Sequence, residues 1–185
     1  MNISKVILSV IVLLFASLAS GQNQTASFTV PISSDSVYKS QSGLLTHKYN
    51  AQKWEIMDRK INQFGEASFA FKTGDAFALI VTEKTPVPFK NLETVIFMNA
   101  RMADEAALML RNEIIKVNSI YVKSLSIKGS FKGISFISEY YVFSSAAGTV
   151  QIVVFSPENQ YNEFRKDYED FLNGAFFTDE KLNRN

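Results

Sequence analysis

The chain has 185 residues, 46% of them hydrophobic, and its 19 basic residues nearly balance its 18 acidic ones. That balance leaves no excess of basic charge of the kind that marks proteins binding nucleic acid or anionic membranes. Cysteine is absent, which excludes disulfides, thiol catalysis and cysteine-ligated metals. The fold must therefore depend on its core, for which 16 phenylalanines supply large apolar side chains.

The N-terminus has the pattern of a secretory signal peptide. Lys5 provides a positive start, Val6–Leu18 is apolar, and small residues at Ser17–Gly21 suit a cleavage site. The apolar run is shorter than the roughly twenty residues that a membrane span needs. We expect residues 1–21 to be removed and the protein to be exported, to the periplasm or the medium; the alternative is an uncleaved N-terminal anchor.

The next segment, residues 22–43, is interpreted as a leader followed by a surface loop. Ser27–Ile32 has the composition of a strand, and the serine-rich stretch after it is typical of a loop. Residues 44–178 are predicted to form a single domain, which opens with a strand at Leu44–Tyr49. The polar tail 179–185 is expected to be frayed.

Two interpretations compete for Asn50–Phe64. Trp54, Met57, Ile61 and Phe64 recur at helical spacing, which favours a helix. A short strand around Trp54 fits the same residues. The periodicity makes the helix the preferred prediction.

A hairpin and a long helix are predicted next. Ala67–Thr73 alternates apolar and polar residues, and a turn then leads into a second strand from Phe77 to Val81. Pro86 and Pro88 end this hairpin because proline cannot continue a strand ladder. Apolar residues at helical spacing from Asn91 to Ile114 predict a helix long enough to cross the sheet, with a break near Asn99.

The following stretch is predicted as a three-stranded meander. Ser119–Lys128 is its first strand, with a change of apolar parity that indicates a bulge. Gly129–Gly133 is interpreted as a β-turn, because its spacing is not that of a phosphate-binding loop. Phe131–Phe143 and Thr149–Phe155 carry apolar residues on both faces, which predicts two central strands covered on both sides.

A helix closes the domain. Ser156 is the expected N-cap, Pro157 the first helical residue and Glu158 a favourable charge in the first turn. Gly174 is expected to end the helix in a left-handed conformation. One face of the helix carries the apolar residues Tyr161, Phe164, Tyr168, Phe171 and Leu172. The order of elements predicts an α+β sandwich, with a single, mainly antiparallel sheet packed by helices on its faces.

This order resembles that of the PsbP-like family. The matching features are Trp54, the hairpin from Glu66 to Glu83, the proline-marked entry to the long helix, the turn at Lys128-Gly129, the strand pair Ile134–Phe155 and a closing helix that ends in Phe171-Leu172. The resemblance covers about 140 residues, the size of one ordinary domain. It implies an α/β sandwich that acts by docking onto partners, and a strand rather than a helix near Trp54. No motif carries a functional residue over.

The sequence offers no catalytic, cofactor-binding or metal-binding residues. His47 is the only histidine, and its polar neighbours predict an exposed side chain. The Gly-x-Ser-x-Gly motif of a serine nucleophile does not occur in the sequence. Charges near Arg101, Asp104 and Glu105, and between Glu163 and Asp170, have the spacing of solvated helix faces.

Aromatic residues are the one surplus, and core packing is their preferred interpretation over an apolar pocket or patch. These residues are Phe69, Phe71, Phe77, Phe136, Tyr140, Tyr141, Phe143 and Phe155. The sequence therefore predicts a non-catalytic exported domain that binds a partner protein or a component of the cell envelope, and that needs no cofactor. The alternatives are a carrier of a small apolar ligand and, last, a hydrolase.

Overall fold

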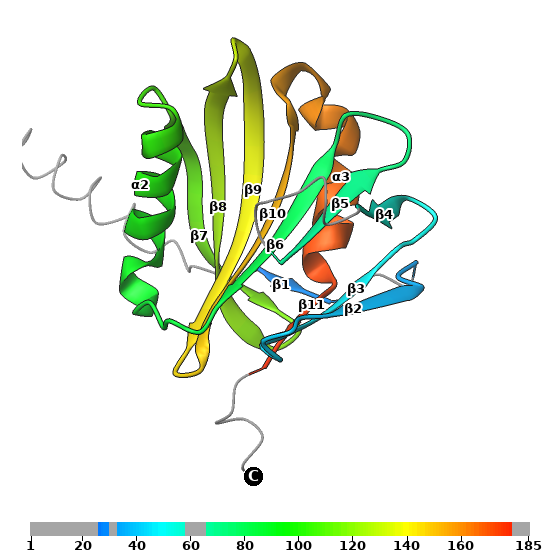
Figure 1. Cartoon of the computed structure of the whole chain (residues 1–185), viewed down its shortest axis with the longest axis vertical. Helices are drawn as coiled ribbons and strands as arrows, with labels where there is room; N and C mark the ends of the chain where they lie inside the picture. Colours follow the sequence, from blue (N-terminus) through cyan, green and yellow to red (C-terminus); the bar gives the residue numbers. More distant parts are fainter. Residues whose placement is uncertain (1–25, 30–32, 58–65, 179–185) are drawn as a thin grey trace, which may run out of the picture.

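Two sheets and two α-helices build the described part of this computed structural model, residues 26–29, 33–57 and 66–178 (Figure 1). The larger sheet has the strand order β1-β7-β8-β9-β10-β6-β5-β4, and the smaller one has the order β11-β3-β2. In chain order the elements are β1 (Ser27–Phe28), β2 (Ser36–Lys39), β3 (Leu45–Tyr49), β4 (Trp54–Ile56), β5 (Ala67–Phe71), β6 (Phe77–Glu83), η1 (Phe89–Asn91), α2 (Leu92–Ala103), β7 (Leu108–Val117), β8 (Ile120–Phe131), β9 (Ile134–Ser145), β10 (Gly148–Pro157), η2 (Glu158–Gln160), α3 (Tyr161–Asn173) and β11 (Ala175–Phe177).

Strands β9 and β10 lie at the centre of the large sheet and are apolar on both faces, as the sequence predicts. Val150 pairs with Phe143 and Ile152 with Tyr141 in an antiparallel ladder. These side chains face α3, whereas Val142 packs on the opposite side with residues of α2. Helices α2 and α3 thus cover opposite faces of one sheet (Figure 1).

The fold class is confirmed as α+β, but the prediction of a single sheet is wrong. Strand β1 pairs with β7 in parallel, so the large sheet is mixed. The second sheet includes Ser36–Lys39, where the serine-rich stretch had predicted a loop. Val37 and Tyr38 within that stretch suit a strand, and β3 supplies the antiparallel partner that the local sequence does not reveal.

The prediction of one long helix from Asn91 to Ile114 is also wrong in its second half. Helix α2 ends at Ala103, Asp104 is extended (φ −148°, ψ 107°), and Leu108–Val117 forms strand β7. Ile115 and Val117 are both buried in the core. They are two residues apart, which is the spacing of side chains on one face of a strand. Over a short stretch the same apolar positions fit the spacing of a helix and that of a strand. Pairing with β8 makes this segment a strand. The bulge lies in β7, between Met109 and Arg111, and not in β8.

The predicted helix at Asn50–Phe64 is replaced at Trp54–Ile56 by strand β4, which pairs with β5. Asn50 caps a turn instead, because its Oδ1 accepts a hydrogen bond from the amide of Gln52 at 2.8 Å. Residues 58–65 lie outside the described residues, as do residues 30–32 of the first predicted strand.

The closing helix has the predicted apolar face, with Phe164, Tyr168, Phe171 and Leu172 buried. Its start differs: Ser156 and Pro157 still belong to β10, a 3-10 turn follows, and Ser156 makes no capping bond. Gly174 has φ −71°, so it is not left-handed. Glycine is needed there because a Cβ would collide with the carbonyl oxygen of Lys48. In the β8–β9 turn, Lys132 and Gly133 do have positive φ.

His47 is fully buried, which contradicts the prediction of an exposed side chain. Leu45, His47 and Tyr49 point inward from β3, while the polar Thr46 and Lys48 that suggested exposure alternate with them. The His47 ring lies 4.4 Å from the ring of Phe171, centroid to centroid, and neither ring nitrogen has a hydrogen-bond partner. Burial lowers the pKa of His47 from 6.5 to about 3.

We predict that His47 makes the fold acid-sensitive. The unfolded chain takes up this proton near pH 6.5 and the folded chain only near pH 3, so stability is lost as the pH falls below 6.5. At pH 5 the loss is about 2 kcal/mol. Urea unfolding of the His47→Leu variant should show a shallower decline between pH 7.5 and pH 5 than the unchanged protein. Parallel pH profiles would contradict this account.

Candidate functional site

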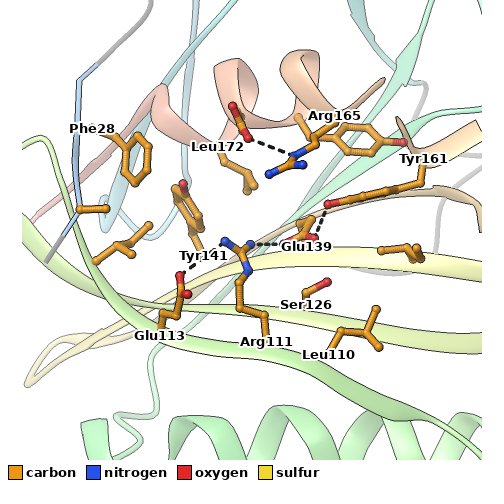
Figure 2. Close-up of a pocket in the computed structure, with 15 residues that line it drawn as sticks. Phe28, Leu110, Arg111, Glu113, Ser126, Glu139, Tyr141, Tyr161, Arg165 and Leu172 are labelled. Atoms are coloured by element: carbon orange, nitrogen blue, oxygen red, sulfur yellow. Dashed lines mark hydrogen bonds and ion pairs between the residues drawn. The ribbon is translucent and has the colours of Figure 1, made fainter. Parts of the chain in front are cut away.

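A pocket of about 320 Å³ with charged residues in its wall lies between α3 and strands β7, β8 and β9 (Figure 2). Its walls carry Arg111, Glu139 and Tyr161, and Phe28 and Leu172 close its apolar side. Glu139 is buried, because β9 points it toward α3 from the middle of the sheet. A buried carboxylate in a cavity is the first place to look for acid–base chemistry.

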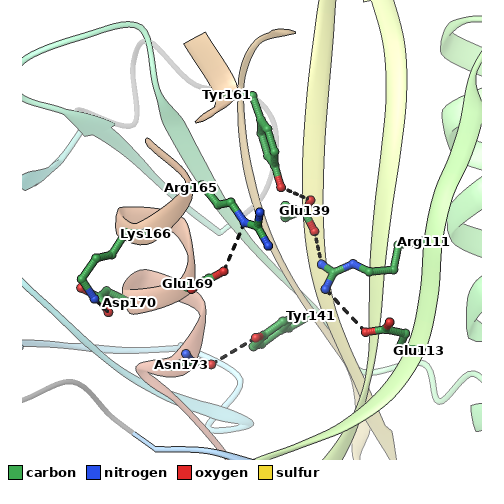
Figure 3. A network of polar contacts seen from close by, with 10 residues as sticks. All are labelled: Arg111, Glu113, Glu139, Tyr141, Tyr161, Arg165, Lys166, Glu169, Asp170 and Asn173. Atoms are coloured by element: carbon green, nitrogen blue, oxygen red, sulfur yellow. Dashed lines mark hydrogen bonds and ion pairs between the residues drawn. The ribbon is translucent and has the colours of Figure 1, made fainter. Parts of the chain in front are cut away.

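The charges in this pocket satisfy one another (Figure 3). One oxygen of Glu139 binds the Arg111 guanidinium, and the other accepts a hydrogen bond from the Tyr161 hydroxyl at 2.6 Å. Arg111 also lies 3.6 Å from Glu113, and the Tyr141 hydroxyl donates to Asn173 at 3.1 Å. Burial, and then the hydrogen bond to Glu139, raises the pKa of Tyr161, which stays a donor at neutral pH.

The polar network therefore ties α3 to the sheet and leaves no unoccupied base at its centre. Arg165 and Glu169, 3.5 Å apart on α3, pair at the pocket mouth. The network was missed in the sequence, although Glu139 in an apolar strand and Arg111 in an expected helix were its signals. Among the described residues, no group of three or more potential metal ligands occurs.

A second hollow lies on the opposite face of the sheet, beside α2. It is an open groove of about 580 Å³ and is mainly apolar. It exists because α2 packs chiefly on β8, so the side chains that β9, β10 and β6 direct to this face remain partly uncovered. The lining residues from these strands are Phe136, Ser138, Tyr140, Gln151, Val153, Phe155, Leu79 and Val81. Small residues of α2, Ala100 and Ala103, form its other wall.

The groove divides the aromatic residues that the sequence singled out. Phe69, Tyr141 and Phe143 are buried in the core, and Phe71 packs against it. Phe136, Tyr140 and Phe155 line the groove, and Phe77 stacks on Phe155 with their centroids 5.6 Å apart. Tyr140 also packs against the core on the α2 side, so core packing is correct for most of the set, while Phe77, Phe136 and Phe155 form an accessible apolar surface. We take this groove as the candidate functional site.

The charged residues predicted to lie on solvated helix faces do so on α3, except that Asp167 is largely covered and pairs with Lys53. Arg165–Glu169 and Lys166–Asp170 are exposed pairs at four-residue spacing. Asp104 is an exception, because it follows α2 and accepts hydrogen bonds from the amide and hydroxyl of Ser130 at 2.6 and 3.0 Å. No helix among the described residues is long and apolar enough to span a membrane.

We predict that the role of Glu139 is to stabilise the fold and not to catalyse a reaction. Replacing Glu139 by Gln removes the charged acceptor of two hydrogen bonds and should lower the free energy of unfolding by about 1–3 kcal/mol. The matched control, Glu169→Gln, breaks an exposed pair and should cost less than about 0.5 kcal/mol. Urea denaturation at neutral pH measures both. Equal costs for the two variants would contradict the structural role.

Comparison with known proteins gives matches only at the level of structure. No family model matches the chain, and no curated protein matches its sequence. Cyanobacterial PsbP (CyanoP) from Synechocystis sp. PCC 6803 has a similar structure, with a TM-score of 0.58 and 11% identity over 80% of this chain and 95% of that one.

Two further solved structures share the architecture. LpqN of Mycobacterium tuberculosis, described as involved in cell envelope biogenesis, has a TM-score of 0.56 and 6% identity over 77% of this chain and 90% of that one. The Ran-binding protein Mog1p of Saccharomyces cerevisiae has a TM-score of 0.52 and 8% identity over 80% and 97%. Identities this low establish the fold alone. The chain has the PsbP-like fold that its order of elements predicts.

Proposed function

We propose that the protein is a non-catalytic, exported binding domain that receives an apolar segment of a partner protein of the cell envelope in the groove beside α2. The observation that carries the proposal is the groove itself. An open apolar surface of this kind on a folded domain is typical of an interaction site. The similar structures include a Ran-binding protein and a protein of cell envelope biogenesis, which is consistent with binding but names no partner.

The chemistry of the groove favours binding over catalysis. Its lining holds one carboxylic acid, Asp104, whose pKa is lowered by hydrogen bonds from Ala106 and Ser130. A carboxylate held ionised by its own loop is a poor proton donor and is already occupied as an acceptor. The remaining polar groups are amides and hydroxyls, such as Asn99, Ser138 and Gln151, which can orient an apolar partner.

A small apolar ligand is the second candidate, and the size of the groove favours it. About 580 Å³ lies within the range of about 300–1,000 Å³ that ligand sites occupy. Phe136, Tyr140 and Phe155 would contact such a ligand. The groove is an open surface hollow, however, whereas small ligands are usually enclosed on most sides. This openness makes a protein segment the first choice.

Export is part of the proposal and rests on the N-terminal pattern of residues 1–21. The mature chain is expected to begin near Gln22, which leaves 164 residues after the first 21 are removed. Intact mass spectrometry of the protein from its native host measures this. A full-length chain recovered from the cytoplasm would contradict export.

The binding proposal is tested by placing a charge in the groove. We expect Phe136→Lys to weaken capture of the partner from the native envelope fraction at least tenfold, because a buried charge without a partner opposes an apolar contact. Val37→Lys is the matched control, since Val37 is 53% exposed on the small sheet. Circular dichroism shows whether both variants remain folded.

Native mass spectrometry of the same samples separates the two candidates. A small-molecule adduct that is lost in Phe136→Lys, without any captured protein, would replace the partner by a ligand. Partner capture that is equally strong in both variants would show that the groove is not the binding surface.

A further inference from the structure

One end of the molecule carries exposed apolar side chains, which we call the apolar end. Helix α2 finishes there, β7 begins there, and the β8–β9 turn projects beside them, at the top of Figure 1. The members are Met102, Leu108, Phe131 and Ile134, with between 53% and 85% of each residue exposed. Side chains of this size, gathered at one end, indicate a contact with something apolar.

The β8–β9 turn holds two of these side chains out in a fixed arrangement. Phe131 and Ile134 are the last paired residues of the β8–β9 ladder and therefore lie on the same face of the hairpin. The turn between them uses positive φ at Lys132 (51°) and Gly133 (80°). Asp104, at the end of α2, fastens the base of the turn through Ser130. The apolar tip is thus braced against the helix.

The charges at this end suit a phospholipid headgroup. Lys132 Nζ lies 5.3 Å from the Phe131 ring centroid, and the Arg101 guanidinium lies 5.9 Å from that of Phe97. Within the described residues neither cation forms an ion pair, although the charge of Arg101 helps to lower the pKa of Asp104. The Asp104 carboxylate is occupied by Ser130 and Ala106. Glu105 is also exposed on this loop and offsets part of the charge, so apolar insertion and not charge must supply most of the binding.

We propose that the apolar end docks reversibly on a phospholipid surface. Phe131 and Ile134 enter the interfacial region first, as aromatic and aliphatic residues of peripheral proteins do, and Met102 and Leu108 follow. Lys132 and Arg101 extend their apolar stems along the interface and reach the lipid phosphates. A projecting turn can enter a soft interface, whereas a protein partner would need a matching pocket. The apolar end meets the groove at Phe131 but extends beyond it, because Ile134 and Lys132 do not line the groove.

The test places a fluorophore at the tip of the mature full-length protein. Trp54 is buried, so its emission should not respond to vesicles. Any change in emission of the Ile134→Trp variant on adding vesicles therefore reports the introduced tryptophan. Vesicles of phosphatidylcholine with 30% phosphatidylglycerol, a composition chosen for the assay, should shift the emission of the introduced tryptophan to shorter wavelength and sediment the protein. Val37→Trp, on the small sheet, is the matched control and should show no shift.

Two further variants separate insertion from charge. Phe131→Ser combined with Ile134→Ser should abolish sedimentation with vesicles, while circular dichroism shows an unchanged fold. Lys132→Ala should weaken binding to the anionic vesicles about fivefold, the factor one basic residue provides near such a surface. Failure of Ile134→Trp to shift or sediment would overturn the proposal. So would a concentration-dependent dimer, seen by analytical ultracentrifugation without lipid and lost in the double variant, because the apolar end would then bind a second copy.

Discussion

The structure depends on two central strands that are apolar on both faces. Neither face of β9 and β10 can be left in water, so each must be covered by another layer. Val150, Ile152 and Val154 require cover on one side. Val142 and Tyr140 require it on the other. The rest of the chain packs against these two faces, and it covers one of them more fully than the other.

The α3 side is covered except at the pocket around Glu139, and this side stabilises the fold. Helix α3 and the small sheet enclose a cluster of rings in which Phe171 contacts Trp54, Phe69 and His47. The polar network around Glu139 fastens the outer part of α3 to β7 and β9. The α2 side is covered only in part, because α2 runs alongside the strands and packs chiefly on β8, so it leaves β10 and β6 uncovered (Figure 1). The groove is the uncovered remainder of an apolar face, which is why binding is the function we propose for it.

The sequence correctly predicts the elements that depend on local patterns of residues. Its predictions are wrong where pairing with a distant strand determines the structure. The β9–β10 hairpin and the buried face of α3 follow from periodicity over ten or more residues. Strand β7 does not, because Ile114 and its neighbours fit helix and strand alike until β8 is placed beside them. An exposed His47 is predicted because Thr46 and Lys48 flank it, yet β2 and β11 pair on either side of β3. The aromatic surplus points to the groove, but the position of α2 over β8 determines which rings remain accessible.

The central claim is that the groove beside α2 is the surface through which this domain binds. It is tested most directly by replacing Tyr140 with the photo-crosslinking residue benzoylphenylalanine in cells, with Tyr121 as the matched control. Tyr140 lines the groove, whereas Tyr121 is 55% exposed at the start of β8. The account predicts a discrete crosslinked product from position 140 and none from position 121. A product from position 121 alone would contradict it, as would the absence of any product from position 140.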